Sequence, residues 1–150
     1  MNRLDQLYKD MILEHNKKPR NFKELSPCTH HSHGKNPLCG DDYYVYLSVS
    51  DDTIDDIAFK GDGCAISKAS GSMMTQALKG KSLKEALDLK ELFLDCVTKD
   101  DFKKQDLMGK LKIFEGVKQF PVRVKCAALV WRALEDALDD KKSKHEVSTE

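Results

Sequence analysis

The sequence predicts an α+β fold, in which several helices pack against one small antiparallel sheet of about three strands. Two observations support this prediction. Apolar residues recur at helical spacing near both ends of the chain, and residues 41–61 contain two runs rich in β-branched and aromatic residues, which are separated by Asp51 and Asp52. With 150 residues and no internal repeat, the chain has the length of one domain. We assign residues 1–140 to that domain and residues 141–150 to a polar, flexible tail.

The N-terminal part of the chain is predicted to contain a helix, a loop and a hairpin. Asn2 can cap the helix, and Pro19 stops it. Residues 19–38 show no periodicity and are predicted to be a long loop. Asp51 and Asp52 are suited to the turn between the two strands of the hairpin that follows. The apolar face of the helix is formed by Leu4, Leu7, Tyr8, Met11 and Ile12.

A helix that packs closely against its neighbours is predicted after the hairpin. It begins at Cys64, directly after two glycines, and it ends at Gly80, a typical C-terminal stop. Small side chains line this helix, which indicates that another element approaches it closely. These small residues are Ala65, Ala69, Ser70, Gly71 and Ser72.

The remainder of the chain is predicted to be helical with one charged link. Short helices are expected over 82–89, capped by Ser82, and over 90–98. A charged link covers 99–110, and one more helical turn is expected over 111–117. A long amphipathic helix closes the fold. Its apolar face contains Ala127, Val130, Trp131, Leu134 and Leu138.

Composition excludes several classes of function. The chain has 25 basic and 25 acidic residues and a pI near 6.9, so it lacks the basic excess that a nucleic-acid-binding surface needs. No apolar stretch is long enough to span a membrane, and the N-terminus has no signal-peptide core. We therefore expect a cytoplasmic protein. Its cysteine count is odd, at 5, which in a reducing compartment favours thiolate chemistry or metal binding over disulfides.

Three of the cysteines are predicted to lie at the ends of elements. Cys39 falls in the turn-like stretch "NPLCGDD" before the first hairpin strand, and Cys64 falls at a helix start, where the helix dipole favours a thiolate. Cys126 lies in the first turns of the last helix. With Asp41, two residues after Cys39, these side chains would make a full tetrahedral set for zinc.

The spacing of these residues also allows a purely structural interpretation. Cys64 and Cys126 are small enough to serve as core hydrophobes, and Asp41 could cap the turn. We assign no site to the other two cysteines, since Cys96 lies in the apolar pattern "ELFLDCV" and Cys28 lies in the predicted loop.

A second, local cluster competes for the role of a metal site. Cys28, His30, His31 and His33 stand within the stretch "CTHHSH", and all four are possible metal ligands. A histidine-rich loop is more often only solvated. A cysteine–histidine hydrolase is also conceivable, but no residue is marked as its base, and the absence of C-x-x-C argues against a thioredoxin-like dithiol.

Three cysteine-centred motifs resemble those of a known family. "NPLCGDD", "GDGCAISKASGSMMTQALKGK" and "FPVRVKCAALVWRAL", in this order, are similar to the motifs of the U-type iron–sulfur assembly proteins. The resemblance extends from "LYKDMILEHNKKPRN" to about residue 139, and it implies a SufE/NifU-like fold. Within the family the chain is more similar to SufU than to the IscU scaffolds. It has an insertion-like segment around 90–116, and Lys125 stands where IscU proteins have a histidine.

The SufU resemblance implies a site and an activity. The implied ligands of a zinc ion are Cys39, Asp41, Cys64 and Cys126, with Arg123 beside them to offset their charge. The implied activity is that of a sulfurtransferase, which accepts persulfide sulfur on Cys39 from a pyridoxal-phosphate cysteine desulfurase of the SufS type. In the implied route a histidine of the desulfurase replaces Cys39 on zinc. The implied partners are this desulfurase and a downstream iron–sulfur scaffold, and the final recipient of the sulfur is left open.

Two alternatives to this activity remain open. The same residues could bind iron or a transient [2Fe–2S] cluster, as in a scaffold protein. The chain could also be a zinc-stabilised interaction domain without chemistry of its own.

Overall fold

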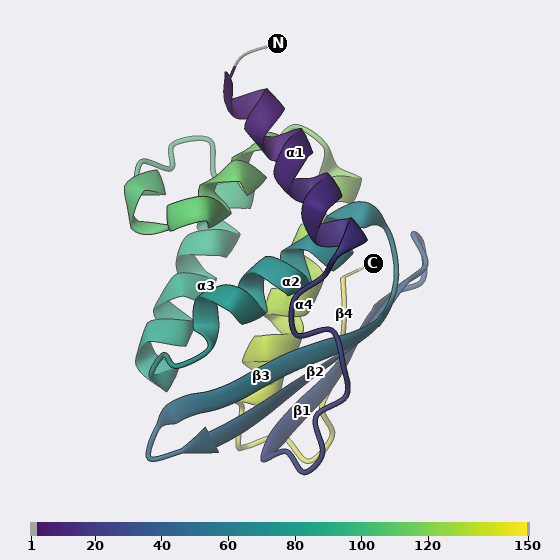
Figure 1. Cartoon of the computed structure of the whole chain (residues 1–150), viewed down its shortest axis with the longest axis vertical. Helices are drawn as coiled ribbons and strands as arrows, with labels where there is room; N and C mark the ends of the chain where they lie inside the picture. Colours follow the sequence, from purple (N-terminus) through teal and green to yellow (C-terminus); the bar gives the residue numbers. More distant parts are fainter. Residues whose placement is uncertain (1–2, 150) are drawn as a thin grey trace.

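The structure is a computed structural model that describes residues 3–149. Its first element is a helix and its last is a short strand (Figure 1). Its helices gather on one side of a mixed sheet, so the α+β prediction is confirmed. None of the described helices has the length and apolar character needed to cross a bilayer. The elements in chain order are α1 (Arg3–Lys17), β1 (His30–Asn36), β2 (Asp41–Ser50), β3 (Thr53–Asp62), α2 (Ala65–Leu78), α3 (Leu83–Thr98), η1 (Gln105–Leu107), η2 (Gly109–Val117), α4 (Pro121–Ala137) and β4 (Glu146–Ser148).

The sheet has the strand order β3-β2-β1-β4 over the described residues. The predicted hairpin is confirmed as β2 and β3, which pair antiparallel. Its turn residues Asp51 and Asp52 have φ angles of 50° and 57°, the left-handed values that a tight two-residue hairpin turn requires. The N-terminal helix is confirmed as α1, although its predicted cap, Asn2, lies outside the described residues.

Strand β1 lies within the segment that we predicted to be a loop, so that prediction is wrong over His30–Asn36. The strand pairs antiparallel with β2 and buries Ser32, Gly34 and Asn36 in alternation. A Cβ atom on Gly34 would lie 3.1 Å from Leu129 Cδ1. Small and polar residues therefore face α4 at close range, and such a strand has none of the β-branched pattern that marks a strand in sequence.

The C-terminal tail contains strand β4, although the sequence predicts a flexible end. Val147 and its neighbours pair parallel with β1, and Val147 packs against the hydrophobic core. Parallel pairing depends on a distant partner strand, which explains why a three-residue strand is not visible in the local sequence.

Two helical predictions also need correction. Residues 82–98, predicted as two short helices, form the single helix α3. Its start is confirmed, since Ser82 and Glu85 form a reciprocal capping box. Instead of one turn over 111–117, the 3₁₀ helix η2 extends over Gly109–Val117. Cys96 is fully buried, as its apolar surroundings predict.

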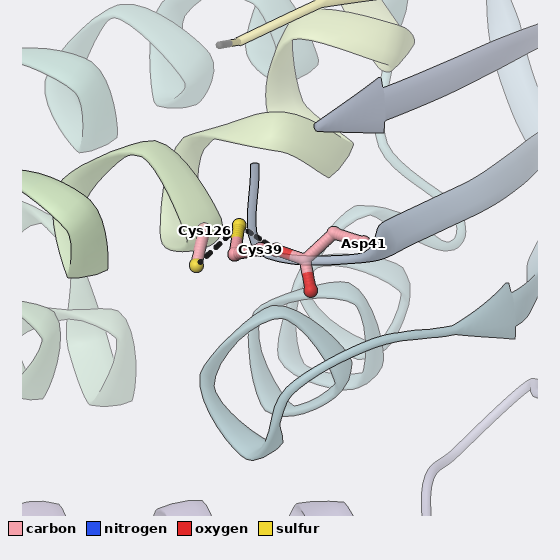
Figure 2. Close-up of side chains that lie close together, drawn as sticks. All are labelled: Cys39, Asp41 and Cys126. Atoms are coloured by element: carbon pink, nitrogen blue, oxygen red, sulfur yellow. Dashed lines mark hydrogen bonds between the residues drawn. The ribbon is translucent and has the colours of Figure 1, made fainter. Parts of the chain in front are cut away.

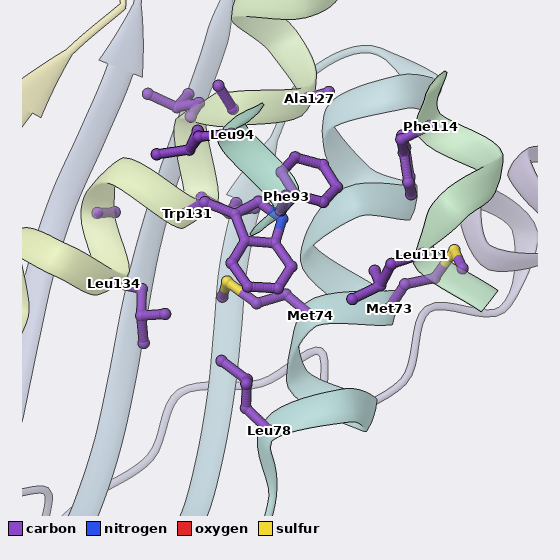
Figure 3. Close-up of a cluster of buried hydrophobic side chains, with 14 of the residues drawn as sticks. Met73, Met74, Leu78, Phe93, Leu94, Leu111, Phe114, Ala127, Trp131 and Leu134 are labelled. Carbon is purple, nitrogen blue, oxygen red and sulfur yellow. The ribbon is translucent and has the colours of Figure 1, made fainter. Parts of the chain in front are cut away.

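Helix α4 lies at the centre of the core (Figure 3). Its Trp131 ring stacks on Phe93 with the ring centroids 4.6 Å apart, and its indole nitrogen donates to Ser70 Oγ at 3.2 Å. Gly71 of α2 lies against Phe59, and a Cβ atom there would stand 2.5 Å from the Phe59 ring. The small residues of α2 therefore allow the close packing that the sequence predicts.

Candidate metal centre

Cys39, Asp41 and Cys126 meet at one end of the sheet, where the β1–β2 turn approaches the start of α4 (Figure 2). The Cys39 thiol donates to Asp41 Oδ2 at 3.4 Å, and the Cys39 and Cys126 sulfur atoms are 3.4 Å apart. One ligand atom from each residue lies within 4.8 Å of the other two. Three of the four predicted ligands therefore converge, although Cys39 and Cys126 are 87 residues apart in the chain.

The Asp41 carboxylate is buried, with 1% of the residue exposed. Its Oδ1 accepts hydrogen bonds from the Cys64 backbone N–H at 2.9 Å and from Ser67 Oγ at 3.1 Å. Among the described residues it makes no ion pair with a lysine, arginine or histidine. A buried carboxylate without a cationic partner is costly, so its neighbourhood fits a bound cation.

The backbone at Gly63 allows the carboxylate to reach this position. A Cβ atom at Gly63 would stand 2.4 Å from Asp41 Oδ1 and 2.7 Å from Ser67 Oγ. No larger residue fits there without displacing Asp41, so the glycine next to Cys64 forms part of the cradle around the carboxylate.

Cys64 lies beside this group but outside it. It is the N-cap residue of α2, as predicted, and its sulfur accepts the Ser67 backbone N–H at 3.4 Å. In this orientation the sulfur caps the first turn of α2, and it is not one of the ligand atoms that lie within 4.8 Å of one another. Its thiol still interacts with that of Cys126, which places it next to the cluster.

The thiols affect one another's acidity. The hydrogen bond from the Cys126 thiol, aided by those from Ser67, lowers the pKa of Cys64 to about 6 against the effect of burial. The same interaction with Cys64, followed by burial, raises the pKa of Cys126. Burial also raises the pKa of Cys39. The cluster therefore favours a thiolate at Cys64 and disfavours further negative charge at Cys39 and Cys126, which a bound cation would offset.

Arg123 is exposed on the first turn of α4 and does not contact the cluster by any hydrogen bond among the described residues. Its guanidinium stacks over the Phe120 ring at 4.3 Å from the centroid, and its charge acts on the buried Tyr8 hydroxyl. Its role in offsetting the charge of the ligands stays a prediction. Lys125 is exposed.

Two residues of the site were not predicted from the sequence. Ser67 Oγ lies 3.1 Å from Asp41 Oδ1 and 3.1 Å from the Tyr43 hydroxyl, and it thereby ties the carboxylate to the sheet. Asn36 Oδ1 accepts the Leu38 N–H at 3.1 Å and so shapes the Cys39 turn. The position of Ser67, three residues after the N-cap, is the only local signal for either role.

The histidine-rich segment does not form a competing site among the described residues. Strand β1 points His30 and His33 to opposite sides of the sheet, because successive residues of a strand alternate between its two faces. His33 contacts Asp42 at 2.6 Å, whereas His30 contacts Asp140 at 3.5 Å. These two histidines therefore have separate partners, and the described residues form no metal-ligand group that contains Cys28.

The fold and the cluster together define a class: α+β domains with a cysteine–aspartate site that can hold a metal ion. The chain belongs to the family of NifU-like N-terminal domains, whose model matches residues 7–127. The family predicted from the three cysteine motifs is therefore confirmed.

Several relatives cover nearly the whole chain. The zinc-dependent sulfurtransferase SufU of Bacillus subtilis (strain 168) is 40% identical over 132 residues, which cover 88% of this chain and 89% of that protein. The iron–sulfur cluster assembly scaffold protein IscU of Streptococcus pyogenes serotype M1 is 38% identical over 138 residues, 92% of this chain and 86% of its own.

Solved structures show the same architecture. A crystal structure from Fervidobacterium islandicum AW-1, described as an iron–sulfur cluster assembly scaffold protein for the SUF system, has a TM-score of 0.83 and 33% identity, covering 89% of this chain and 98% of that one. An N-terminal NifU-like domain from Brucella abortus has a TM-score of 0.80 at 23% identity, covering 91% and 95%, and supports the fold alone.

Proposed function

We propose that this protein is a zinc-dependent sulfur acceptor in iron–sulfur cluster assembly, which takes persulfide sulfur from a SufS-type cysteine desulfurase onto Cys39. The observation that carries the proposal is the buried Asp41 carboxylate, which forms no ion pair within residues 3–149. It lies 3.4 Å from the Cys39 thiol, which is itself 3.4 Å from the Cys126 sulfur. The 40% identity with a protein named a zinc-dependent sulfurtransferase supports it further.

Cys39, Asp41, Cys64 and Cys126 are the residues that we propose to hold zinc. Thiolate sulfurs and carboxylate oxygens are both ligands of zinc, and these four complete a tetrahedral set. Cys64 would have to turn away from the Ser67 N–H to join the other three. Zinc bound there would keep the thiols deprotonated at neutral pH.

Cys39 is the thiol best placed to act as the acceptor. It is partly exposed in a turn, whereas Cys126 is buried with 3% of the residue exposed and Cys64 is held at a helix cap. Leu38, its neighbour, is 79% exposed, so this turn lies at the surface that a partner protein can reach.

The transfer is a thiol–disulfide exchange in its chemistry. The Cys39 thiolate attacks the terminal sulfur of the persulfide on the desulfurase, and a new sulfur–sulfur bond forms on Cys39. The original sulfur–sulfur bond breaks, and the desulfurase cysteine leaves as a thiolate that can take a proton from solvent. The sulfur then passes to a downstream iron–sulfur scaffold.

Turnover of a SufS-type desulfurase, measured with and without this protein, tests the proposal. We expect stimulation by the wild type, loss of stimulation by Cys39→Ala, and normal stimulation by Cys28→Ala, which changes a cysteine outside the site. Metal analysis should find about one zinc per chain. Full stimulation by Cys39→Ala would contradict the acceptor role.

A scaffold for a [2Fe–2S] cluster is the second candidate, and the 38% identity with a protein named an IscU scaffold favours it. The cluster would then be cargo of the same residues. Iron and sulfide bound in equal amounts after reconstitution, with the matching visible absorption bands, would favour this role over sulfur transfer.

A further inference from the structure

The C-terminal segment, residues 142–149, lies along β1 and is attached at both of its ends. At the first end, Asp136 is buried near the end of α4, where its Oδ2 accepts from Ser32 Oγ at 2.7 Å. Lys142 pairs with the other carboxylate oxygen, and His145 Nδ1 donates to the Asp136 carbonyl at 2.8 Å. This part of the segment is thereby tied to both α4 and β1.

The middle of the segment is strand β4. Its register pairs Glu146 with His33 and Ser148 with Lys35, and the His33 N–H donates to the His145 carbonyl at 3.1 Å. An ion pair between Lys35 and Glu146, at 3.2 Å, adds a side-chain link to the ladder. The strand therefore holds the segment in one register along β1.

Thr149, at the second end, contacts both segments that carry site cysteines. Its hydroxyl donates to the carbonyl of Lys125, the residue before Cys126, at 3.2 Å. The same hydroxyl accepts from Asn36 Nδ2 at 3.4 Å, and its backbone N–H donates to the Lys35 carbonyl at 3.3 Å. One side chain thus joins the start of α4 to the end of β1.

Asn36 transmits this contact to the Cys39 turn. Asn36 is buried, with 2% of the residue exposed, and its side-chain oxygen accepts from the Leu38 N–H at 3.1 Å. Its backbone carbonyl accepts from the Cys39 N–H at 3.3 Å. The amide group of Asn36 therefore has Thr149 on its nitrogen and the Cys39 turn on its oxygen.

We propose that residues 145–149 form a strap that positions the Cys39 turn against Cys126, with Thr149 and Asn36 as positioning residues for sulfur acceptance at Cys39. The strap limits the orientations of the turn, and so it sets how often the Cys39 sulfur faces an incoming persulfide. This inference rests on the proposed function for its consequence in catalysis, but the positioning itself is a property of the fold.

Hydrogen exchange of the full-length protein tests the positioning directly. Thr149→Val keeps the shape of the side chain but loses both hydroxyl contacts. We expect the amides of residues 38–40 to exchange about 3- to 10-fold faster, the effect of losing the one hydrogen bond that reaches this turn through Asn36. Thr149→Ser retains the hydroxyl and should exchange like the wild type. Thr98→Val is the matched control, because it removes a threonine hydroxyl bond to a carbonyl, at 2.6 Å, near the end of α3.

The same variants are then assayed with a SufS-type desulfurase. We expect Thr149→Val to lower the maximal stimulated rate by a similar factor while the concentration for half-stimulation stays unchanged, and Thr149→Ser to restore the rate. Unchanged exchange over residues 38–40 in Thr149→Val would overturn the strap, as would equal acceleration in all peptides. If the wild type does not stimulate the desulfurase, the proposed function is wrong. The hydrogen-exchange result for Thr149→Val then still tests whether the strap positions the Cys39 turn.

Discussion

At the scale of the residue, Asp41 is the clearest sign of what the site needs. Its two oxygens have different partners, since Oδ1 accepts from the Cys64 N–H and Ser67 whereas Oδ2 faces the Cys39 thiol. The oxygen of an uncharged amide could accept the same two hydrogen bonds that Oδ1 accepts. The negative charge of Asp41 is therefore unnecessary for these hydrogen bonds and is suited to a cation.

Replacing Asp41 by asparagine should separate metal binding from folding. We expect zinc content to fall well below that of the wild type, because a neutral amide is a weaker ligand than a carboxylate. Without metal, we expect the free energy of unfolding to stay within about 1 kcal/mol of the wild-type value or to rise, since an unpaired buried charge is removed. Zinc analysis and urea unfolding in chelator measure the two effects.

Asp42→Asn is the matched control, because Asp42 is exposed on the opposite side of β2 and contacts His33 instead. It should retain normal zinc content. If Asp41→Asn kept its zinc and lost more than about 2 kcal/mol of stability, the carboxylate would be a structural group and no ligand.

At the scale of the element, the attachment of α1 to α2 depends on one buried hydrogen-bond chain. His15 Nδ1 lies 2.7 Å from Ser72 Oγ, which also accepts the Arg20 N–H at 2.8 Å. Ser72 can donate its proton to Nδ1 only when His15 is neutral. The small residue Ser72 thus serves both the close packing of α2 and the position of α1.

His15 makes this attachment sensitive to acid. Burial, with smaller effects of Arg20 and Lys110 and against that of Glu14, lowers the pKa of His15 from its ordinary 6.5. The stability contributed by the neutral ring is therefore complete above pH 6.5 and is lost as the pH falls below this value through the lowered pKa. The loss should be at most about 1.4 kcal/mol per pH unit.

Urea unfolding between pH 7.5 and 5 checks this prediction. His15→Asn, whose side-chain oxygen can accept from Ser72 at any of these pH values, should show a flatter dependence than the wild type. His31→Asn changes an exposed histidine and should follow the wild-type curve. Parallel curves for the wild type and His15→Asn would show that His15 does not titrate in this range.

The contact of α2 with the sheet can be tested at Gly71. In Gly71→Ala the new methyl would stand 2.5 Å and 2.6 Å from two atoms of the buried Phe59 ring, which is itself packed edge-on by Phe22. We expect a loss of about 1–3 kcal/mol, as in other overpacked cores, despite the better helix propensity of alanine.

Gly116→Ala is the comparison for this change, since its methyl would meet the Tyr8 ring at 3.4 Å or more, an ordinary contact. Its unfolding midpoint should stay near that of the wild type. Equal midpoints for the two alanine variants would mean that Phe59 moves aside freely and that α2 does not pack as closely as the structure shows.

At the scale of the whole molecule, local patterns predicted most of the elements. The Asp51–Asp52 turn, the Ser82 cap and the helix start at Cys64 each depend on neighbours in sequence, and each is found in the structure. Strands β1 and β4 depend on distant partners instead. Neither has enough apolar residues to be predicted as a strand without knowledge of α4 and β2.

The sequence motifs named the residues of the candidate site, but they contained no information on its geometry. The motifs indicated Cys39, Asp41, Cys64 and Cys126, because cysteines at element ends are suited to converge. The structure brings three of these together and shows that Cys64 faces Ser67. Contacts such as that of Thr149 with Asn36, which are 113 residues apart, have no local signal.

The hydrophobic core is separate from the site, and this predicts how the molecule responds to metal removal. The cluster of buried apolar residues around Trp131 includes none of the four proposed ligands. We therefore expect the chelated protein to remain folded and to unfold cooperatively. Because the proposed ligands come from segments that meet only in the folded state, zinc should stabilise that state by linkage, by about 2.7 kcal/mol at a free concentration 100 times its Kd.

Thermal and urea unfolding at a series of buffered zinc concentrations measure this stabilisation. The Cys28→Ala variant should respond to zinc as the wild type does, whereas Cys126→Ser should unfold at one midpoint whatever the zinc concentration. If the wild type in chelator showed no cooperative unfolding transition, the metal would be required for folding. This result would contradict the expectation that the hydrophobic core alone maintains the fold. A zinc-independent midpoint in the wild type would instead show that Cys39, Asp41 and Cys126 lie together without binding zinc, because any ligand that binds only the folded state must raise its stability.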